Sequence, residues 1–587
     1  MISKAKIQKL KSAPAVIKTI IAQARSRNIG EYIQGLLVEL CRIDTTPNSE
    51  VSVMRGAENR CFQILERELK ALAFADGRME RRLINPQIQS HPHYSLPHFT
   101  KTRKRPAGLS AEATYAARSN LVYVAPGQNN KLSGQSVALN AHVDVVAPYF
   151  PPRIKNGVVF GRGACDDKGP VVAMMTALRI LSAAMTQSGM RWNRNVVAMF
   201  VVEEETGGNG SLSLATDREL KRLYDSVVVG ECAGMRIYPA NRGAVWYKAE
   251  LKPARGISAF EMSAFVIEEM EKEGAAIRAE SRHNLFPQRP VQTCHGIIGP
   301  FGEHPSRICG EVRFNIQFDN RAARVSKRSR PNLQIESLVR DCLESGLAQY
   351  VGLYGDKTKV TDAATGRPLV ARHYDFKRRG NGFEVTVHGA TGHMGAIRER
   401  DGAITKMAHL VRSLVLSKSK LSAVAGRIQI ELAGASGDSL ILEGGQGFVP
   451  THSMDEVMTR MRAAAQRGAE NYLRRSGRSE PAAQFVTVAY EKLHNAAFDG
   501  DPDSPAMRNA IAAAKMSGIW RDEPVAGWTV SCDARLFATE YPGMPVLTFG
   551  PGELAFAHSD QEQIALRDVA KAAEFLALFL LRQTGTI

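Results

Sequence analysis

Short, largely apolar runs recur between residues 136 and 231, and each ends in an acid or a histidine. Residues 136–146 read SVALNAHVDVV, residues 196–208 read VVAMFVVEEETGG, and residues 226–231 read SVVVGE. Between the first two, GRGACDDKGP (161–170) leads into a longer apolar run that predicts a helix. Apolar runs of this length predict buried strands of a parallel or mixed sheet.

The polar residues that end these runs form the first candidate site. In open α/β sheets, ligands bind beyond the carboxyl ends of the strands. We therefore expect these side chains to converge: His142, Asp144, the glutamates at 203–205, and Glu231. Taken singly, a His-x-Asp pair is more often a surface or capping pair, and a run of glutamates is more often a solvated helix start. Neither alternative explains why all of them follow apolar strands, so the pattern favours a site for divalent metals.

Flanking segments extend this α/β pattern. Residues 30–75 predict two helices with a break at 44–47, and residues 119–127 predict a strand that leads to the first motif. Near the C-terminus, residues 545–552 predict a last strand and residues 566–581 an amphipathic helix.

Residues 88–112 interrupt the pattern with His91, His93, His98 and many basic residues. Histidines this close in sequence could bind a metal. We predict instead an exposed insertion that forms a flexible loop.

From residue 243 to residue 492 the pattern changes and repeats. Strand-like runs and amphipathic helices follow the order βαββαβ twice, which predicts two ferredoxin-like units in tandem, 243–380 and 381–492. The first has strands at 245–251, 291–298, 310–319 and 368–372, with helices from 258 and 333. The second has strands at 383–387, 427–432, 439–443 and 485–490, with helices from 404 and 453. Residue identity between the two is slight, so this prediction rests on element order.

Length and charge set the broad class. A chain of 587 residues predicts two or three domains, and 44% hydrophobic content suffices for large cores. The formal net charge of +17 raises the question of nucleic acid or an anionic surface. Apart from the first thirty residues and 101–105 the basic residues are spread out, and no nucleic-acid-binding signature accompanies them. We predict solvated surfaces, with an organelle transit peptide as the alternative for the first segment.

Targeting signals and cysteines point to the compartment. No apolar stretch approaches membrane-spanning length, and Lys18 interrupts the one candidate secretory core. The eight cysteines lack paired spacing, which suits a reducing compartment. We therefore predict a cytoplasmic protein with a small-molecule substrate and no nucleic-acid or membrane partner.

Five motifs together resemble one known family. They are HVD (142–144), GRGACDDKG (161–169), EEETGG (203–208), VVVGE (227–231) and AHSDQEQ (557–563). Their order and spacing are similar to the zinc-dependent exopeptidases and deacylases, which include carboxypeptidase G, acetylornithine deacetylase, succinyl-diaminopimelate desuccinylase and several dipeptidases. The resemblance covers the chain from about residue 35 to the C-terminus. It implies a mixed-sheet α/β catalytic domain in two parts, 1–242 and 493–587, with the two ferredoxin-like units inserted as a lid.

The resemblance implies a binuclear metal centre. Two divalent ions about 3.5–4 Å apart can hold both oxygens of an amide hydrolysis. Asp166 would bridge them, and Asp144 would orient the imidazole of His142. The remaining ligands would be His142 and Glu231 for one ion, and Glu205 and His558 for the other. Such ligands suit zinc, with manganese or cobalt as alternatives.

Further roles are carried over in the same way. Glu204 would be the general base. His393, in the segment GATGHM, is similar to the lid histidine that stabilises the oxyanion. Arg535 is a candidate for the substrate carboxylate, with a surface ion pair to Asp533 as an equally weighted alternative.

The doubled lid has a consequence for assembly. In single-lid relatives the lid histidine reaches the active site of a partner subunit, whereas some dipeptidases of the family have a second lid unit that imitates the partner. This chain resembles the latter arrangement. We therefore predict that His393 acts within its own chain and that the protein is a monomer.

The sequence thus predicts a binuclear metal amidohydrolase that cleaves short peptides. The doubled lid and the DDKGP segment resemble dipeptidases, whereas Glu231 in place of an aspartate resembles the N-acyl amino acid deacylases, which stay the alternative. A non-catalytic binding protein on the same fold is the alternative from another class. That reading expects a lost metal ligand, and none is missing.

Overall fold

The computed structural model divides the chain into two compact units, which are described separately. It describes residues 15–128, 135–289, 291–319, 330–362, 365–398, 400–435, 437, 439–490 and 494–585. The first unit comprises Met1–Ala244, Arg282–Gln288 and Lys492–Ile587. The second comprises Val245–Ser281 and Arg289–Glu491.

A mixed seven-stranded sheet forms the centre of the first unit, with the order β1-β2-β6-β3-β7-β20-β8. Strand β3 is parallel to β6 and β7, and β20 is parallel to β7, whereas β1, β2 and β8 pair antiparallel. The strands are β1 (Arg78–Leu83), β2 (Ser119–Ala125), β3 (Val137–His142), β6 (Val196–Val201), β7 (Ser226–Gly230), β8 (Ile237–Tyr238) and β20 (Val546–Phe549). The predicted mixed α/β fold is confirmed.

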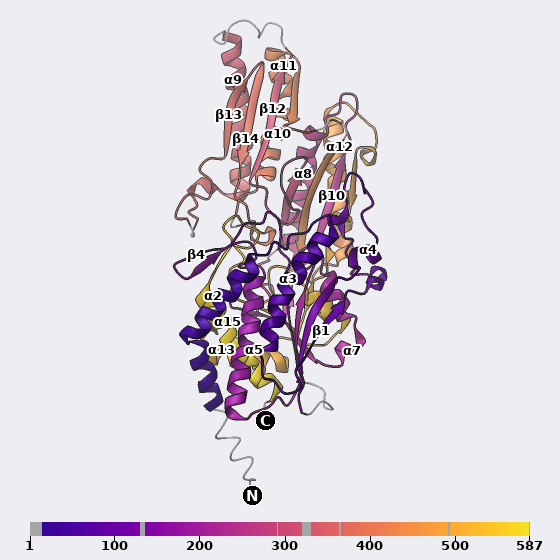
Figure 1. The fold of residues 1–587 in the computed structure, drawn as a ribbon. Coiled ribbons are helices and arrows are strands. Elements are labelled where there is room, and N and C mark those ends of the chain that lie inside the picture. Colours follow the sequence, from indigo (N-terminus) through magenta and orange to yellow (C-terminus); the bar gives the residue numbers. More distant parts are fainter. Residues whose placement is uncertain are drawn as a thin grey trace. The chain divides into compact units, whose positions relative to one another are not determined.

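Helices cover both faces of this sheet, which explains its unbroken apolar strands. On β6, Val196, Ala198 and Phe200 enter one core, while Val197, Met199 and Val201 enter the other. The first core is shared with α2 (Arg27–Cys41), α3 (Val51–Lys70), α5 (Lys168–Ser188), α13 (Pro505–Ser517) and α15 (Leu566–Thr584). Helices α2, α5, α13 and α15 lie together in Figure 1. The second is shared with α6 (Asn209–Ala215), α7 (Arg218–Lys221) and α14 (Ala534–Glu540).

Helix α5 is largely apolar and buried. Within the described parts of the chain it is the one helix long and apolar enough to cross a membrane, and 83% of its most apolar stretch is buried inside the protein. Its packing against α15 is that of a core helix.

The histidine-bearing insertion is ordered, so the predicted flexible loop is wrong. It contains η1 (Pro86–Ser90) and η2 (His98–Thr100) and leads to α4 (Ala111–Tyr115). Ser95 and Thr100 are fully buried. The Ser95 amide donates to Asn209 Oδ1 at 3.1 Å, and the Leu109 amide donates to Thr100 Oγ1 at 2.9 Å. Short polar side chains accept hydrogen bonds from its backbone amides, and the hydropathy pattern does not show such contacts.

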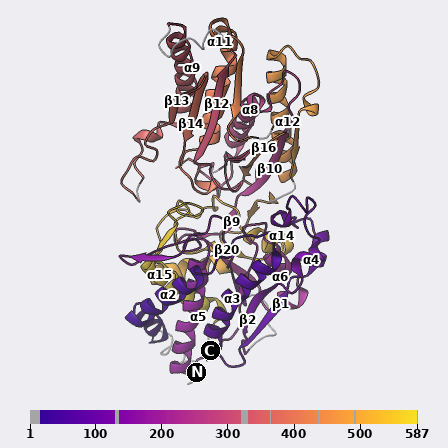
Figure 2. The same cartoon turned by 45° about the horizontal axis from the view of Figure 1, so that its top comes forward.

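The second unit contains two antiparallel sheets (Figure 2). The first has the order β11-β16-β10-β17, with α8 and α12 packed against it and each other. The second has the order β13-β14-β12-β15, accompanied by α9, α10 and α11. The strands are β10 (Gly243–Leu251), β11 (Thr293–Ile298), β12 (Glu311–Phe318), β13 (Tyr374–Arg379), β14 (Gly382–His388), β15 (Ile428–Leu432), β16 (Leu440–Phe448) and β17 (Val486–Ala489). The helices are α8 (Ala259–Glu280), α9 (Arg330–Tyr354), α10 (Ala403–Leu416), α11 (Lys418–Ala425) and α12 (Met454–Arg475).

The strand pairing corrects the predicted tandem order. β10 and β11 pair with β17 and β16, and the strands of the second sheet lie between these two pairs in the sequence. The second sheet is thus nested within the first rather than following it. Tandem and nested units share one order of elements along the chain, so hydrophobic pattern alone does not separate them. The strand expected at 368–372 is β13, a few residues later, and the expected boundary at residue 492 lies outside the described residues.

Candidate active site

The predicted polar residues lie at the ends of three neighbouring strands, at one edge of the central sheet. β3 ends at His142, β6 runs into the glutamates at 203–205, and β7 runs into Glu231. Because these strands are parallel, their carboxyl ends meet at the same edge. All of these side chains are buried or nearly so.

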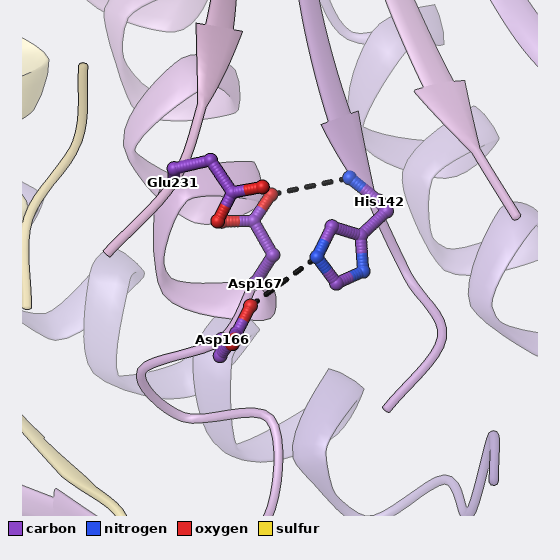
Figure 3. A group of neighbouring side chains, drawn as sticks. All are labelled: His142, Asp166, Asp167 and Glu231. Carbon is purple, nitrogen blue, oxygen red and sulfur yellow. Dashed lines mark hydrogen bonds and ion pairs between the residues drawn. The ribbon is translucent and has the colours of Figure 1, made fainter. Parts of the chain in front are cut away.

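Four side chains converge beside the end of β3 (Figure 3). His142, Asp166, Asp167 and Glu231 each offer one ligand atom, and these atoms lie within 4.8 Å of one another. His142 Nε2 lies 3.2 Å from Asp166 Oδ1, and the His142 amide donates to Asp167 Oδ2 at 3.1 Å. Asp167 was not among the predicted ligands, although the DDKG segment contains it.

A second group shares one residue with the first. Asp166, Glu205 and His558 place one ligand atom each within 4.8 Å of one another. His558 Nε2 lies 3.3 Å from Asp166 Oδ2 and 3.0 Å from Glu205 Oε2. Asp166 therefore faces both groups through its two carboxylate oxygens.

Asp144 fixes the orientation of His142. The imidazole Nδ1 lies 3.0 Å from the Asp144 carbonyl oxygen, which only accepts, so this nitrogen carries the proton and Nε2 faces the cluster. The Asp144 carboxylate, 3.4 Å from Nδ1, also accepts the amides of Glu204 at 3.3 Å and Glu205 at 3.0 Å. One aspartate thus ties β3 to the turn after β6.

Glu562 holds the turn that presents Asp166, a role that the sequence did not reveal. Its Oε1 accepts the amides of Cys165 and Asp166, both at 3.0 Å, and its Oε2 accepts from Arg162 Nη1 at 2.5 Å. The side chains of Glu562 and Arg162 are both fully buried. The residue lies within the AHSDQEQ motif, which is the one signal that could have identified it.

The three consecutive glutamates have different surroundings. Glu203 has a positive φ of 67° and pairs with the buried Arg118, while Tyr115 Oη donates to it at 3.0 Å. Glu205 contacts His558. Glu204 lies between them and its Oε2 is 3.9 Å from His142 Nε2, with 15% of its side chain exposed. Of the three, Glu204 is left without a close ion pair in this part of the structure, so it is available to a substrate.

The buried acids outnumber the positive charges around them. Burial, followed by the charges of Glu204 and Asp166, raises the pKa of Glu231 well above its usual range. Burial also raises the pKa of Glu205, and burial together with Asp533 raises that of Glu204. Bound cations would remove this repulsion. Imidazole nitrogens and carboxylate oxygens are the donors that zinc, manganese and cobalt accept, so the residues fit two divalent ions.

Arg535 lies on α14 and contacts the turn that follows β6. It is buried, with 1% of its surface exposed. The alternative of a surface ion pair with Asp533 is therefore wrong. Arg535 Nη2 donates to the Gly207 carbonyl at 3.0 Å, while among the described residues Nε and Nη1 have no hydrogen-bond partner. Asp533, which the sequence did not single out as a site residue, is itself buried, and burial raises its pKa.

His393 belongs to the second unit, where its loop (residues 391–398) follows β14. Its Nδ1 accepts the Gly395 amide at 2.9 Å. The Met394 amide donates to the Ser306 carbonyl at 2.8 Å, and Gln292 Nε2 donates to the carbonyls of Met394 and Gly395 at 3.2 and 3.1 Å. Backbone contacts from neighbouring segments thus set the conformation of this loop.

Comparison with known sequences gives a family match over most of the chain. Residues 138–582 match the model of peptidase family M20/M25/M40. A [LysW]-lysine/[LysW]-ornithine hydrolase of Saccharolobus islandicus (strain L.S.2.15 / Lassen #1) is 31% identical over 125 residues, which cover 21% of this chain and 33% of that protein. A putative enzyme of the same name from Pyrobaculum aerophilum is 29% identical over 179 residues, 30% of this chain and 48% of that protein. The chain therefore aligns with about a third to a half of these curated relatives.

Solved structures share the fold over nearly the whole chain. The di-peptidase Dug1p of Saccharomyces cerevisiae superposes with a TM-score of 0.54 at 13% identity, covering 97% of this chain and 98% of that one. Human carnosine dipeptidase 1 gives a TM-score of 0.50 at 12% identity, covering 97% and 100%. At these identities the likeness concerns the fold alone.

Proposed function

Because the chain belongs to peptidase family M20/M25/M40, we propose that it is a binuclear metal-dependent hydrolase that cleaves short peptides at an amide bond. The observation that carries this proposal is the pair of buried ligand groups that share Asp166. A structural ion-pair network would balance its charges, whereas here the buried carboxylates exceed their partners and keep raised pKa values.

The first unit is proposed as the catalytic domain. His142 and Glu231 are proposed to hold one ion, Glu205 and His558 the other, with Asp166 between them. The ions, when bound, supply Lewis-acid polarisation and neutralise developing negative charge. Asp144 keeps the proton of His142 on Nδ1, which leaves Nε2 free to ligate.

Glu204 is proposed as the general base. It lies at the edge of the ligand cluster, partly exposed, and its main-chain amide is anchored by Asp144. A carboxylate in this position can take a proton from the attacking water and pass it to the leaving nitrogen. Burial raises the pKa of Glu204, while bound cations would favour its ionised, proton-accepting form.

Arg535 and His393 are proposed to act on the substrate itself. Nε and Nη1 of Arg535 have no hydrogen-bond partner among the described residues, and a guanidinium N–H can donate to a carboxylate oxygen of a peptide C-terminus. His393 would donate to the carbonyl oxygen as it gains negative charge, a contribution of about 3–4 kcal/mol for one donor. Arg535 would thereby favour a short peptide with a free carboxylate.

The second unit is proposed as a lid made of two nested ferredoxin-like units. In support, each of its sheets combines two βαβ halves in the strand order of that fold, β17-β10-β16-β11 and β15-β12-β14-β13. We propose that the doubled lid lets His393 act within its own chain, so that the protein works as a monomer. Eight free, buried cysteines support a reducing, cytoplasmic location.

An N-acyl amino acid deacylase is the second candidate function. Glu231, which stands where the dipeptidases of the family have an aspartate, favours it. The [LysW]-lysine/[LysW]-ornithine hydrolases found by comparison point in the same direction, since their name describes hydrolysis of a [LysW]-linked lysine or ornithine. Both candidates share the metal centre and differ in the group on the acyl side.

A hydrolysis screen tests the proposal. Purified protein is assayed on unblocked dipeptides and on N-acetyl and N-succinyl amino acids, with and without a chelator. The Glu204→Gln variant serves as a control for contaminating hydrolases. We expect chelator-sensitive cleavage of dipeptides that Glu204→Gln lacks. Cleavage confined to N-acyl amino acids would favour the deacylase, and no cleavage of either class would refute both.

A further inference from the structure

A cavity in the second unit shares no residue with the acidic site. Its volume is about 390 Å³, the size of a small-molecule site. Helices α8 and α9 and the segment after His393 line it. The side chains that matter to its chemistry are Arg278, Tyr350, Leu353, Tyr354, Lys357 and Arg398.

The cations that line the cavity wall include Arg278, Lys357 and Arg398. Among the described residues, no ion pair joins Arg278, Lys357 or Arg398 to an acid. Arg278 instead faces Arg398 and Arg289, and burial followed by these two charges lowers its pKa. Lys357 Nζ donates to the Arg398 carbonyl at 2.6 Å, a contact that leaves its charge uncompensated. Like charges that line one cavity repel, so a bound anion would stabilise this wall.

The other charged groups at the cavity already have partners. Glu271 accepts from Tyr354 Oη at 2.9 Å and from Thr405 Oγ1 at 3.0 Å, and His295 Nε2 lies 3.3 Å from it. Arg400 pairs with Asp362 at 3.0 Å. The charged groups of the cavity that are left to interact with a ligand are therefore positive.

The cavity lining also contains aromatic and apolar side chains. Tyr350 and Tyr354 stack with their ring centroids 4.9 Å apart, and Leu353 is 70% exposed on the same helix. An exposed leucine beside a cationic cluster suits a ligand with one charged end and one apolar end.

We propose that this cavity binds a small organic phosphate, with its phosphate at Arg278, Lys357 and Arg398 and its aromatic or apolar body against Tyr354 and Leu353. A phosphate monoester carries close to two negative charges at neutral pH, which matches several cations better than a single carboxylate does. Guanidinium groups also bind phosphate oxygens through paired hydrogen bonds.

Such a ligand would act on the His393 loop (residues 391–398). Ile397 and Arg398 belong to this loop and line the cavity, whereas Arg278 lies on α8. A phosphate bound by both arginines would tie the end of the loop to the helix and change turnover through the position of His393. This effect on turnover rests on the proposed role of His393, whereas the binding itself does not.

Calorimetry on the metal-loaded full-length protein tests the binding, at constant ionic strength, with phenyl phosphate and inorganic phosphate as probes. We expect phenyl phosphate to bind more tightly than inorganic phosphate. Arg278→Gln and Arg398→Gln should each weaken it by roughly tenfold or more, the usual effect of losing a charge-assisted hydrogen bond. The matched control is Arg475→Gln, which removes an exposed arginine of the same unit and should change nothing.

Two outcomes would overturn the proposal. Phenyl phosphate affinity that survives Arg278→Gln, in a variant whose thermal unfolding is unchanged, would place the anion at the metal centre or elsewhere. An Arg278→Gln effect on KM for a free dipeptide but not for its C-terminal amide would make the cavity a subsite for the substrate carboxylate. Binding retained in His393→Ala would support the proposal even if the protein proved not to be a peptidase.

Discussion

Neighbouring residues with the same side chain serve different purposes in the turn after β6. Glu203 faces inward to Arg118, Glu205 contacts His558, and Glu204 lies at the margin of the ligand cluster. Replacement of each carboxylate by an amide keeps its size and removes its charge. The proposed roles therefore predict distinct consequences for Glu204 and Glu205.

Glu204→Gln should abolish most activity without loss of metal. The variant keeps the amide contact to Asp144 and the ligand set, and it loses the proton acceptor. We expect the turnover number to fall by roughly two to four orders of magnitude, the usual effect of removing a general base. Steady-state kinetics with metal analysis by mass spectrometry measures both quantities. A turnover number within a factor of about ten of the parent would exclude Glu204 as the base.

Glu205→Gln should instead weaken metal binding. Its carboxylate lies 3.0 Å from His558 Nε2 and belongs to the group with Asp166, so its loss removes a charged ligand from one ion. Metal content after dialysis should fall toward one ion per chain. If Glu205→Gln kept both ions and Glu204→Gln lost one, the two roles would be reversed.

At the level of elements, the turn at residues 161–170 depends on a support from the far end of the sequence. Glu562 accepts two successive amides of this turn and pairs with Arg162 inside the protein. A turn that presents a shared ligand has to be fixed before the metal arrives, because residues behind the ligands set the affinity of a site. Glu562 therefore links the C-terminal motif to the position of Asp166.

Glu562→Gln should lower both stability and metal affinity. It leaves the buried Arg162 without its counter-charge, a loss that typically costs about 3–5 kcal/mol. The turn at residues 161–170 would also be held less firmly, which should weaken metal binding by about 10–100-fold. The matched control is Asp401→Asn, which breaks a fully buried pair with Lys406 in the second unit. We expect that control to lower the unfolding midpoint and to leave metal affinity unchanged, and an equal loss of metal affinity in both would refute a specific role for Glu562.

Sequence pattern predicted the central sheet and most of its site because both depend on local features. Buried parallel strands are continuously apolar, and their carboxyl ends lie at one edge of the sheet. The sequence alone therefore predicted that His142 and Glu231 lie close together. The match to peptidase family M20/M25/M40 confirms the family that the motifs resembled. Glu562 was missed because it acts through backbone contacts that only the folded chain creates. The nested arrangement of the two sheets was not predicted, because strand pairing depends on contacts between residues far apart in the sequence. The hydropathy pattern does not show which strands pair.

At the scale of the whole molecule, the proposed assembly depends on the proposed doubled lid. The two sheets of the second unit have the same strand order, and we propose that one of them replaces the lid of a partner subunit. An internal partner of this kind would cover strand edges that another copy would otherwise pair with. A monomer with its own His393 would follow from such an arrangement.

Mixing two inactive variants tests whether His393 acts in its own chain. Glu204→Gln supplies an intact lid, and His393→Ala supplies an intact base. If His393 acts in cis, the mixture should stay inactive and the specific activity of the parent protein should not change on dilution. Recovery of activity on mixing, measured against each variant alone, would show that the histidine serves a neighbouring molecule.

The metal content of the protein tests the central claim most directly. Protein purified without chelator and dialysed against metal-free buffer is analysed by inductively coupled plasma mass spectrometry, alongside a Glu205→Gln sample. The account predicts two divalent ions per chain, most readily zinc, and loss of activity when a chelator removes them. A stoichiometry near zero in active protein would contradict the account.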